Sequence, residues 1–194
     1  MKIVGLLLAA GLSSRMGQPK QLLAWRGQPL VTYVARQALA SQLAGLTVVV
    51  GASADQVREA LRELPVTIIT NPSYQEGLGT SLAAGLRALP ADSDAAMVLL
   101  VDQPLVTTRL IDELIAAYHA APDALALVPT YQGQRGNPVI IAAPLFAELQ
   151  TLRGDTGARA IFNRHAERIV WHEVADPAIV IDVDTPEAWR SLTD

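Results

Sequence analysis

Residues 3 to 20 read IVGLLLAAGLSSRMGQPK, an apolar run that passes directly into small residues and two cations. The apolar run, Ile3–Leu8, predicts a buried strand. Small residues let backbone N–H groups approach phosphate oxygens closely, and Arg15 and Lys20 can neutralise the remaining charge. The stretch contains neither Gly-Lys-Ser/Thr nor G-x-G-x-x-G, so it is neither a P-loop nor a dinucleotide-binding loop. It predicts a polyphosphate-binding loop of another kind; the alternative is a surface turn rich in Gly and Ser.

The composition predicts one domain with a full core. A chain of 194 residues is too short for two sizeable cores. Hydrophobic residues make up 51% and charged residues 18%, which fits a packed α/β domain and excludes a disordered chain. The net charge of −4 gives no sign of a surface for nucleic acid or an anionic membrane. Because there is no cysteine, disulfides, thiolate metal sites and thiol nucleophiles are excluded.

The N-terminus has only the outline of a signal peptide. Lys2 precedes a run of apolar residues, but the run is short and passes into a charged loop without a cleavage site. No later segment approaches the length needed to span a membrane. We therefore expect a cytoplasmic protein with neither a membrane nor nucleic acid among its partners.

Short β-branched runs alternate with longer amphipathic ones, which is the rhythm of βαβ units. The expected strands are Ile3–Leu8, Leu46–Val50, Val66–Thr70, Ala96–Val101, Leu125–Val128, Pro138–Ile141, Ile169–His172 and Val180–Val183. The expected helices are Leu30–Ser41, Asp55–Leu64, Thr80–Leu89, Thr107–Ala120, Pro144–Gln150, Thr156–Arg164 and Pro186–Leu192. Several strands are apolar throughout, as when helices cover both faces of a sheet. The sequence therefore predicts a single-domain, Rossmann-like three-layer α/β/α fold with a mixed, mostly parallel sheet.

Polar residues follow several predicted strands, where open α/β sheets bind their ligands. Asn71 follows the third strand, and its amide can read a base edge or hold a ribose hydroxyl. Asp102 follows the fourth, and a carboxylate there suits Mg²⁺, which takes one or two carboxylates with phosphate oxygens and waters. Asp184 is the expected second carboxylate, and strand alternation puts Asp182 on the same face. Alternatively, Asp184 caps the helix that begins at Pro186, and Asp182 is a structural hydrogen-bonding group.

Leu8 to Lys20 resembles the motif L-A-A-G-x-S-x-R-M-G-x-x-K of the MobA-like nucleotidyltransferases. The Ala9-Ala10-Gly11 form is closer to the branch of molybdenum cofactor cytidylyltransferases, the MocA type, than to the guanylyltransferase branch, which tends to carry Ala-Gly-Gly. The resemblance extends along most of the chain through Asn71-Pro72, Gly77-Leu78-Gly79-Thr80-Ser81, Val101-Asp102-Gln103-Pro104, Gly136-Asn137-Pro138 and Asp182-Val183-Asp184-Thr185-Pro186-Glu187. The first motif is specific to the superfamily, and the later ones mainly indicate the branch.

The resemblance implies a fold like that of the nucleotide-diphospho-sugar transferases and a role for particular residues. In residues 1–194, the N-terminal half would bind the nucleotide and the C-terminal half the acceptor. The implied nucleotide-binding residues are Leu8, Ala9, Ala10, Gly11, Arg15, Lys20, Asn71, Gly79 and Ser81; the catalytic residues are Arg15, Lys20 and Asp102; the metal ligands are Asp102 and Asp184; and the acceptor-binding residues are Arg135, Asn137 and Arg159. The alternatives are a solvated Arg15, a turn capped by Thr80 or Ser81, and a helix capped by Asp155 or Thr156.

The resemblance also implies a reaction. With Mg²⁺ or Mn²⁺, a CMP group would pass from CTP to the phosphate of molybdopterin or its molybdenum-loaded form, and pyrophosphate would leave. Transient docking to a molybdoenzyme or its maturation factor would follow. The alternatives are another donor such as GTP, another acceptor such as a sugar or alditol phosphate, or a carrier that binds the cofactor without turnover. An NAD-dependent oxidoreductase is disfavoured because G-x-G-x-x-G is missing.

Overall fold

The computed structural model describes residues 1–13, 16–152, 154 and 159–193, without the side chains of residues 159, 160 and 193. Its centre is a sheet in the order β10-β7-β9-β6-β1-β4-β5, with β8 paired to β7 and a separate β2–β3 hairpin. The strands are β1 (Ile3–Ala9), β2 (Ala24–Trp25), β3 (Gln28–Pro29), β4 (Leu46–Val50), β5 (Thr67–Thr70), β6 (Ala95–Leu100), β7 (Ala126–Tyr131), β8 (Gln134–Arg135), β9 (Val139–Ala142) and β10 (Ile169–Glu173). The helices are α1 (Leu30–Leu39), α2 (Ala54–Leu61), α3 (Leu78–Ala88), α4 (Thr108–His119), α5 (Phe146–Leu149), α6 (Arg159–Arg164) and α7 (Pro186–Thr193).

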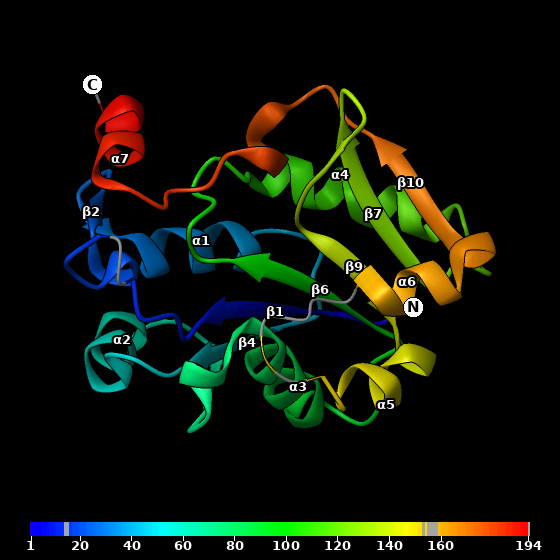
Figure 1. Cartoon of the computed structure of the whole chain (residues 1–194), viewed down its shortest axis with the longest axis horizontal. Helices are drawn as coiled ribbons and strands as arrows, with labels where there is room; N and C mark the ends of the chain where they lie inside the picture. Colours follow the sequence, from blue (N-terminus) through cyan, green and yellow to red (C-terminus); the bar gives the residue numbers. More distant parts are fainter. Residues whose placement is uncertain (14–15, 153, 155–158, 194) are drawn as a thin grey trace.

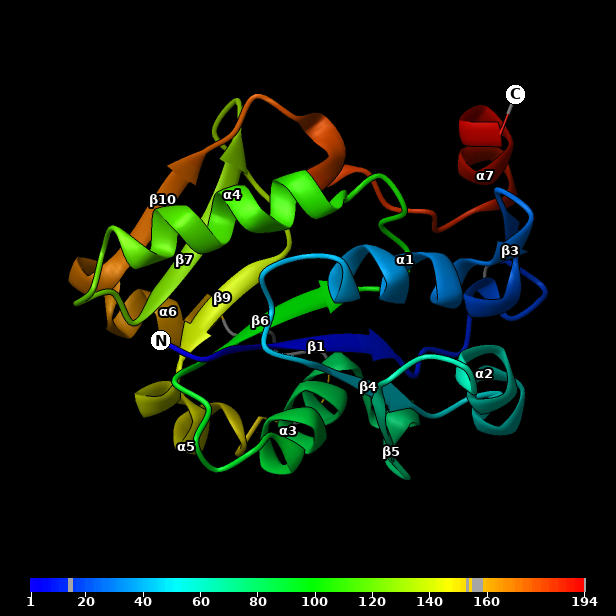
Figure 2. The ribbon, with the colours of Figure 1, turned by 180° about the vertical axis from the view of Figure 1, so that it is seen from behind.

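Helices cover both faces of the sheet and make three layers. α3 packs against β1 and β4, with α5 beside it (Figure 1). α1 and α4 cover the other face and lie in front of the sheet when the molecule is seen from behind (Figure 2). This double cover explains why β1 is apolar and buried along its whole length: its side chains alternate between two apolar layers. The predicted α/β fold with a mixed, mostly parallel sheet is confirmed.

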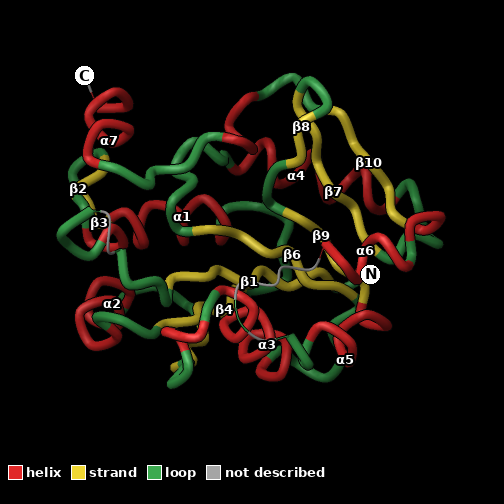
Figure 3. Tube along the Cα trace, viewed as in Figure 1, coloured by secondary structure: helices red, strands yellow, loops and turns green. Residues whose placement is uncertain are grey.

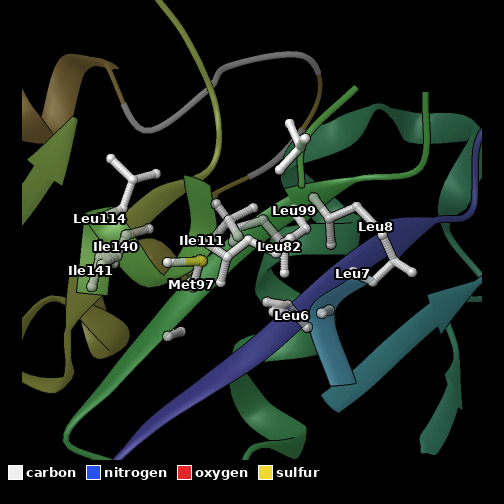
Figure 4. Close-up of a cluster of buried hydrophobic side chains, with 14 of the residues drawn as sticks. Leu6, Leu7, Leu8, Leu82, Met97, Leu99, Ile111, Leu114, Ile140 and Ile141 are labelled. Carbon is white, nitrogen blue, oxygen red and sulfur yellow. The ribbon is translucent and has the colours of Figure 1, made fainter. Parts of the chain in front are cut away.

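The core is continuous across β1 and β6. These strands pair in parallel, with Leu7 opposite Leu99. Figure 4 shows side chains of both strands meeting those of α3, α4 and β9, among them Leu6, Leu7, Leu8, Leu82, Met97, Leu99, Ile111, Leu114, Ile140 and Ile141. The packing holds the carboxyl ends of β1 and β6 rigidly side by side.

The β9 strand makes the sheet mixed, because it runs antiparallel to both β6 and β7. β7 and β8 form a hairpin whose two-residue turn, Gln132 and Gly133, has φ angles of 50° and 76°. Positive φ at both positions is typical of a type I′ turn, whose twist matches that of paired strands. Arg26 and Gly27 join β2 to β3 in the same way, with φ angles of 49° and 78°. Figure 3 shows β8 where the β7 hairpin leaves the main sheet.

One predicted strand is wrong. Pro177–Val180 is a 3₁₀ turn, and residues 181–184 continue without regular structure instead of forming the strand Val180–Val183. Val183 is nevertheless fully buried against Met16 and Leu23. The apolar residues within 180–183 therefore indicate that the segment is buried, but they do not indicate that it pairs with a strand.

The helices agree with prediction except at their ends. The helix expected at Thr80–Leu89 begins two residues earlier, at Leu78, so Thr80 lies inside its first turn and does not cap it. The segment Pro144–Gln150 divides into a 3₁₀ turn, Ala143–Leu145, and the short α5. Of the helix expected at Thr156–Arg164, the part from 156 to 158 lies outside the described residues. No helix in the described ranges is long and apolar enough to cross a membrane.

Candidate active site

The candidate site lies where the strand order changes direction. From β1 the chain moves to β4 and β5 on one side and then returns to β6 on the other. The Val101 N–H donates to the Leu8 carbonyl at 3.3 Å, so the loops after β1 and β6 leave the sheet together. Ligands bind at such switch points in open α/β sheets because two loops diverge there.

The loop after β1 is held from inside by Gln21, which is fully buried. Its Nε2 donates to the carbonyls of Ala9 and Gly11 at 3.1 and 2.7 Å. Its Oε1 accepts a hydrogen bond from Ser13 Oγ at 3.3 Å. Ser13 Oγ in turn accepts a hydrogen bond from the Lys20 N–H at 3.0 Å. The loop thus closes on itself, and the backbone of Lys20 is placed directly beside the end of β1. Gln21 therefore positions this loop from inside.

Lys20 bridges the two predicted metal ligands. Its Nζ donates to Asp102 Oδ2 and, at 3.1 Å, to Asp184 Oδ1. The Lys20 and Asp102 side chains are only 14% and 16% exposed, and that of Asp184 is 37% exposed. Burial of the ammonium lowers the pKa of Lys20, but the two carboxylates outweigh it, so the pKa is raised above its ordinary value. Lys20 therefore carries a full positive charge at neutral pH.

Asp184 reaches this cluster from a segment without regular structure. The Val183 N–H donates to the Asp102 carbonyl at 2.8 Å. The helix that follows is capped by Thr185, whose Oγ1 accepts from the Ala188 N–H at 3.2 Å. Because Thr185 serves as the cap, the alternative role of Asp184 as a helix cap is not supported. Its carboxylate turns toward Lys20 instead.

A cavity of about 490 Å³ opens beside this cluster. Of the residues predicted to bind a nucleotide or metal, its lining includes Leu8, Ala10, Gly11, Lys20, Ser81 and Asp102. Leu12, Tyr74 and Leu78 also line it, although we did not predict a role for them. Ala9 is fully buried at the end of β1 and meets Gln21 through its carbonyl. The predicted phosphate loop thus forms one wall of a cavity that contains the buried cation.

Asn71 has a positioning role and does not face the cavity. It is buried, and its Nδ2 donates to Thr80 Oγ1 at 2.9 Å and to Ser81 Oγ at 3.0 Å. Its Oδ1 accepts from the Ser73 N–H at 3.0 Å. Both amide hydrogens are used within the chain, and the expected contact of Asn71 with a base or ribose stays a prediction. The side chain instead orients Ser81 toward the cavity.

A second cavity, of about 210 Å³, adjoins the first and is almost entirely apolar. Both cavities are lined by Leu8, Leu78 and Leu100, which form a shared wall. Gly79, predicted to bind the nucleotide, lines this second cavity together with Arg135 and Asn137, two of the residues predicted to bind the acceptor. The predicted contact of Gly79 with the nucleotide stays a prediction.

Trp171 is 44% exposed. The Arg135 guanidinium lies 4.2 Å from the centre of its ring, which is cation–π distance. Trp25 and Trp189 pack together, with ring centres 5.5 Å apart. The Trp171 ring thus supports a cation beside the apolar cavity.

Two predicted residues cannot be placed. Arg15 lies outside the described residues, and so does the side chain of Arg159, as do Asp155 and Thr156. Among the described residues, no group of three or more His, Asp or Glu side chains gathers as a metal site. Asp102 and Asp184 are therefore the acidic pair that the described part of the chain offers at this point.

Known proteins resemble this chain over most of its length. The family model of the MobA-like NTP transferase domain matches residues 5–169. The nicotine blue oxidoreductase of Paenarthrobacter nicotinovorans is 31% identical over 98% of this chain and 96% of its own length. The purine catabolism protein PucB of Bacillus subtilis is 29% identical over 96% and 94%. The molybdenum cofactor cytidylyltransferase of Escherichia coli is 28% identical over 94% and 91%.

Solved structures share the whole architecture. Rv0371c from Mycobacterium tuberculosis superposes with a TM-score of 0.87 at 26% identity, over 99% of this chain and 97% of that one. A structure of Rv0371c in complex with manganese superposes with a TM-score of 0.80 at 26% identity, over 99% and 98%. The relatives therefore agree on the fold, while their names differ in the chemistry they describe.

Proposed function

Because the chain belongs to the family of MobA-like NTP transferase domains, we propose that it moves a CMP group from CTP to the phosphate of molybdopterin or Mo-molybdopterin. The observation that carries this proposal is the Lys20–Asp102–Asp184 cluster beside two adjoining cavities. Nucleotidyl transfer needs a donor site and an acceptor site side by side, with concentrated charge at their junction. The E. coli cytidylyltransferase, similar over nearly the full chain, supports the choice of donor and acceptor.

The reaction requires no covalent nucleophile from the protein. An oxygen of the acceptor phosphate forms a bond to the α-phosphorus of CTP while the bond to the bridging oxygen breaks. Pyrophosphate leaves with that electron pair. Negative charge moves from the attacking phosphate to the leaving group, so catalysis depends on positioning and on fixed positive charge. Lys20, charged and partly buried at the cavity wall, supplies such a charge.

Asp102 and Asp184 fit a divalent cation. Both carboxylates approach one ammonium group, so two hard oxygen donors already converge on a single cation position. Mg²⁺ commonly takes one or two carboxylates and completes its shell with phosphate oxygens and water. Bound Mg²⁺, or Mn²⁺, would offset the charge of the triphosphate and of the leaving pyrophosphate. The manganese complex of Rv0371c, a protein of the same fold at 26% identity, supports a divalent metal here.

The second cavity favours a flat ring as acceptor over a sugar. Its lining is mainly aliphatic, with Leu82, Val98 and Ile141 among the side chains. A polyhydroxylated sugar would leave its hydroxyl groups without partners against such walls, which costs binding energy. The two faces of a pterin ring could pack there, with its polar edge and its phosphate toward Arg135 and Asn137.

A second candidate function comes from the relative in Paenarthrobacter nicotinovorans. That protein is named an oxidoreductase and is 31% identical over 98% of this chain. A nearly apolar cavity beside a nucleotide-sized one would also suit transfer of a hydride to a flat organic substrate. Oxidation of NADH or NADPH, with no release of pyrophosphate from any nucleotide, would identify this activity.

The test of the proposal is pyrophosphate release by purified protein. CTP, GTP, ATP and UTP are each supplied with Mg²⁺ and a molybdopterin-type cofactor, and then without metal or without cofactor. We expect release with CTP alone, and only when metal and cofactor are both present. Release with another nucleotide would overturn the choice of donor. Binding of nucleotide and cofactor without any release would favour the carrier.

A further inference from the structure

Gln103 ties the segment that carries Asp184 to the end of β6. It follows Asp102 directly and is only 2% exposed. Its Nε2 donates to the Ile179 carbonyl at 3.1 Å and to Asp182 Oδ1 at 2.8 Å. Both amide hydrogens are therefore used to hold one short stretch, residues 179–182.

This tie is important because Asp184 has no strand to hold it. The segment 181–184 has no ladder of hydrogen bonds to a neighbouring strand. Val183 anchors it by packing against Met16 and Leu23. Apolar packing sets how deeply a segment is buried but leaves it free to slide, whereas directional hydrogen bonds set its register. Two of those bonds come from the Gln103 side chain and a third from the Val183 N–H to the Asp102 carbonyl.

The Gln103 side chain is also imperfectly satisfied. Among the described residues its Oε1 has no hydrogen-bond partner, although that oxygen is buried. A buried acceptor without a partner destabilises a folded protein. An apolar residue of the same size would avoid this cost, but it would leave the Ile179 carbonyl and the Asp182 carboxylate without the donors of Gln103. The bonds made by its amide group are therefore the reason for a glutamine here.

We propose that Gln103 is a positioning residue that sets where the Asp184 carboxylate stands relative to Asp102, and thereby the affinity of the pair for a divalent cation. The inference rests on the proposed function, since it takes Asp102 and Asp184 as the metal pair. The Ile179 carbonyl, which Gln103 holds, also accepts from the Asn137 N–H at 3.0 Å. The same tie therefore connects the metal pair to the edge of the apolar cavity.

The test is the affinity of the protein for Mn²⁺ alone, measured from the loss of the free-ion signal in electron paramagnetic resonance. Gln103→Leu keeps the size of the side chain and removes both donors. We expect its Mn²⁺ dissociation constant to rise about 10- to 100-fold, the usual effect of losing a group that orients a metal ligand. Thr32→Val is the matched control, because Thr32 Oγ1 donates to the Ala60 carbonyl at 2.8 Å in a buried contact between α1 and α2. Its Mn²⁺ affinity should match that of the wild type.

If Gln103→Leu does not fold, two variants at Asp182 test the same inference. Asp182→Asn retains an oxygen that accepts from Gln103, whereas Asp182→Ala removes it. We expect near wild-type affinity in the first and a 10-fold or greater loss in the second. Equal losses in both would show that the charge of Asp182 matters and the tie does not, which overturns the inference.

The remaining outcomes separate this inference from the proposed function. Wild-type affinity in a folded Gln103→Leu protein, together with measurable Mn²⁺ binding by the wild type, overturns the role of Gln103 and leaves the metal pair intact. Absence of Mn²⁺ binding by the wild type, both with and without CTP, overturns the metal pair, and the inference with it. Unfolding midpoints of all variants show which proteins are folded.

Discussion

At the scale of single residues, Lys20 and the two carboxylates that it bridges concentrate charge at one point. Three separate stretches of the sequence predict that Lys20 binds phosphate and that Asp102 and Asp184 bind metal. In the structure the three groups are in hydrogen-bond contact. Ammonium and divalent cation are thus offered the same carboxylate oxygens, and an arriving triphosphate provides Lys20 with other anionic partners.

Replacement of Asp102 should separate catalysis from folding. We expect Asp102→Asn to lower the rate of pyrophosphate release at least about 100-fold, because it removes one of two carboxylates that hold charge at the site. The unfolding midpoint should change little, since Lys20 keeps Asp184 as a partner. Asp92→Asn, an exposed partner of Lys2 far from the site, is the control. Unchanged turnover in Asp102→Asn would contradict the assignment of Asp102.

The stacking of Arg135 on Trp171 should affect the acceptor and not the nucleotide. An exposed cation–π contact contributes about 0.5–1 kcal/mol, or roughly two- to fivefold in binding. We expect Trp171→Leu to raise the KM for the acceptor by about that factor, with kcat and the KM for CTP unchanged. Trp171→Phe keeps a ring and should behave like the wild type. Equal effects of both variants would show that the ring does not hold Arg135.

The sequence predicts the site residues that directly follow a strand. It does not predict those whose role depends on a partner far away in the chain. Asp102 was predicted because a carboxylate after an apolar run lies at the edge of a parallel sheet. Gln103, the next residue, was given no role, because its partner Asp182 is 79 residues away in the chain and no local pattern connects them. Asn71 was predicted to contact the ligand. The sequence does not distinguish an amide that binds a ligand from one that hydrogen-bonds neighbouring groups in a turn.

At the scale of elements, the structure differs from prediction where a buried apolar segment does not pair with a neighbouring strand. Val180–Val183 has the composition of a strand, yet it makes no ladder, and Val183 packs beside Met16 and Leu23 instead. The strands β2, β3 and β8 were not predicted, because each is only two residues long. Arg26-Gly27 and Gln132-Gly133 were the available signals, in place of the more usual Asn-Gly.

Gly136 is where the cavity edge meets the segment that leads to Asp184. A Cβ placed on it would lie 2.3 Å from the Ile179 carbonyl oxygen, which is backbone and cannot rotate away. We expect Gly136→Ala to destabilise the protein by about 1–3 kcal/mol, as overpacking does. Gly45→Ala is the control, since nothing lies within 4 Å of its added Cβ, and it should change stability by less than about 1 kcal/mol. Denaturant titration measures both, and equal stabilities would contradict the close contact.

Glu148 joins α5 to α6 and should make stability depend on pH. Hydrogen bonds from Arg164, and then from His165, hold the pKa of its carboxyl below the usual range. A lowered carboxyl pKa stabilises the fold above the unfolded value, near pH 4.5, and that contribution is lost as the pH falls through the folded value. We expect Glu148→Gln to unfold at a lower temperature than the wild type at pH 7. The difference should disappear in acid; a difference that persists at pH 2 would mean lost packing instead.

At the scale of the whole molecule, one core extends across the sheet from α4 to α3. We expect residues 1–194 to unfold in one transition, as a single domain does. In Trp171→Phe, fluorescence reports on Trp25 and Trp189 near α7, and circular dichroism reports on the sheet and helices. The two signals should coincide. Met97→Ala, at a fully buried position of β6, should lower the unfolding free energy by about 2–5 kcal/mol in both signals together. Separate transitions would show two domains.

The wall of Leu8, Leu78 and Leu100 has a consequence for inhibition. Since each of these side chains touches both cavities, the two compartments are only one residue apart. A single bisubstrate compound, carrying a nucleotide analogue at one end and a flat aromatic group at the other, could occupy both with a short linker. Such a molecule loses its translational freedom once instead of twice, so its affinity can exceed that of either half by several orders of magnitude.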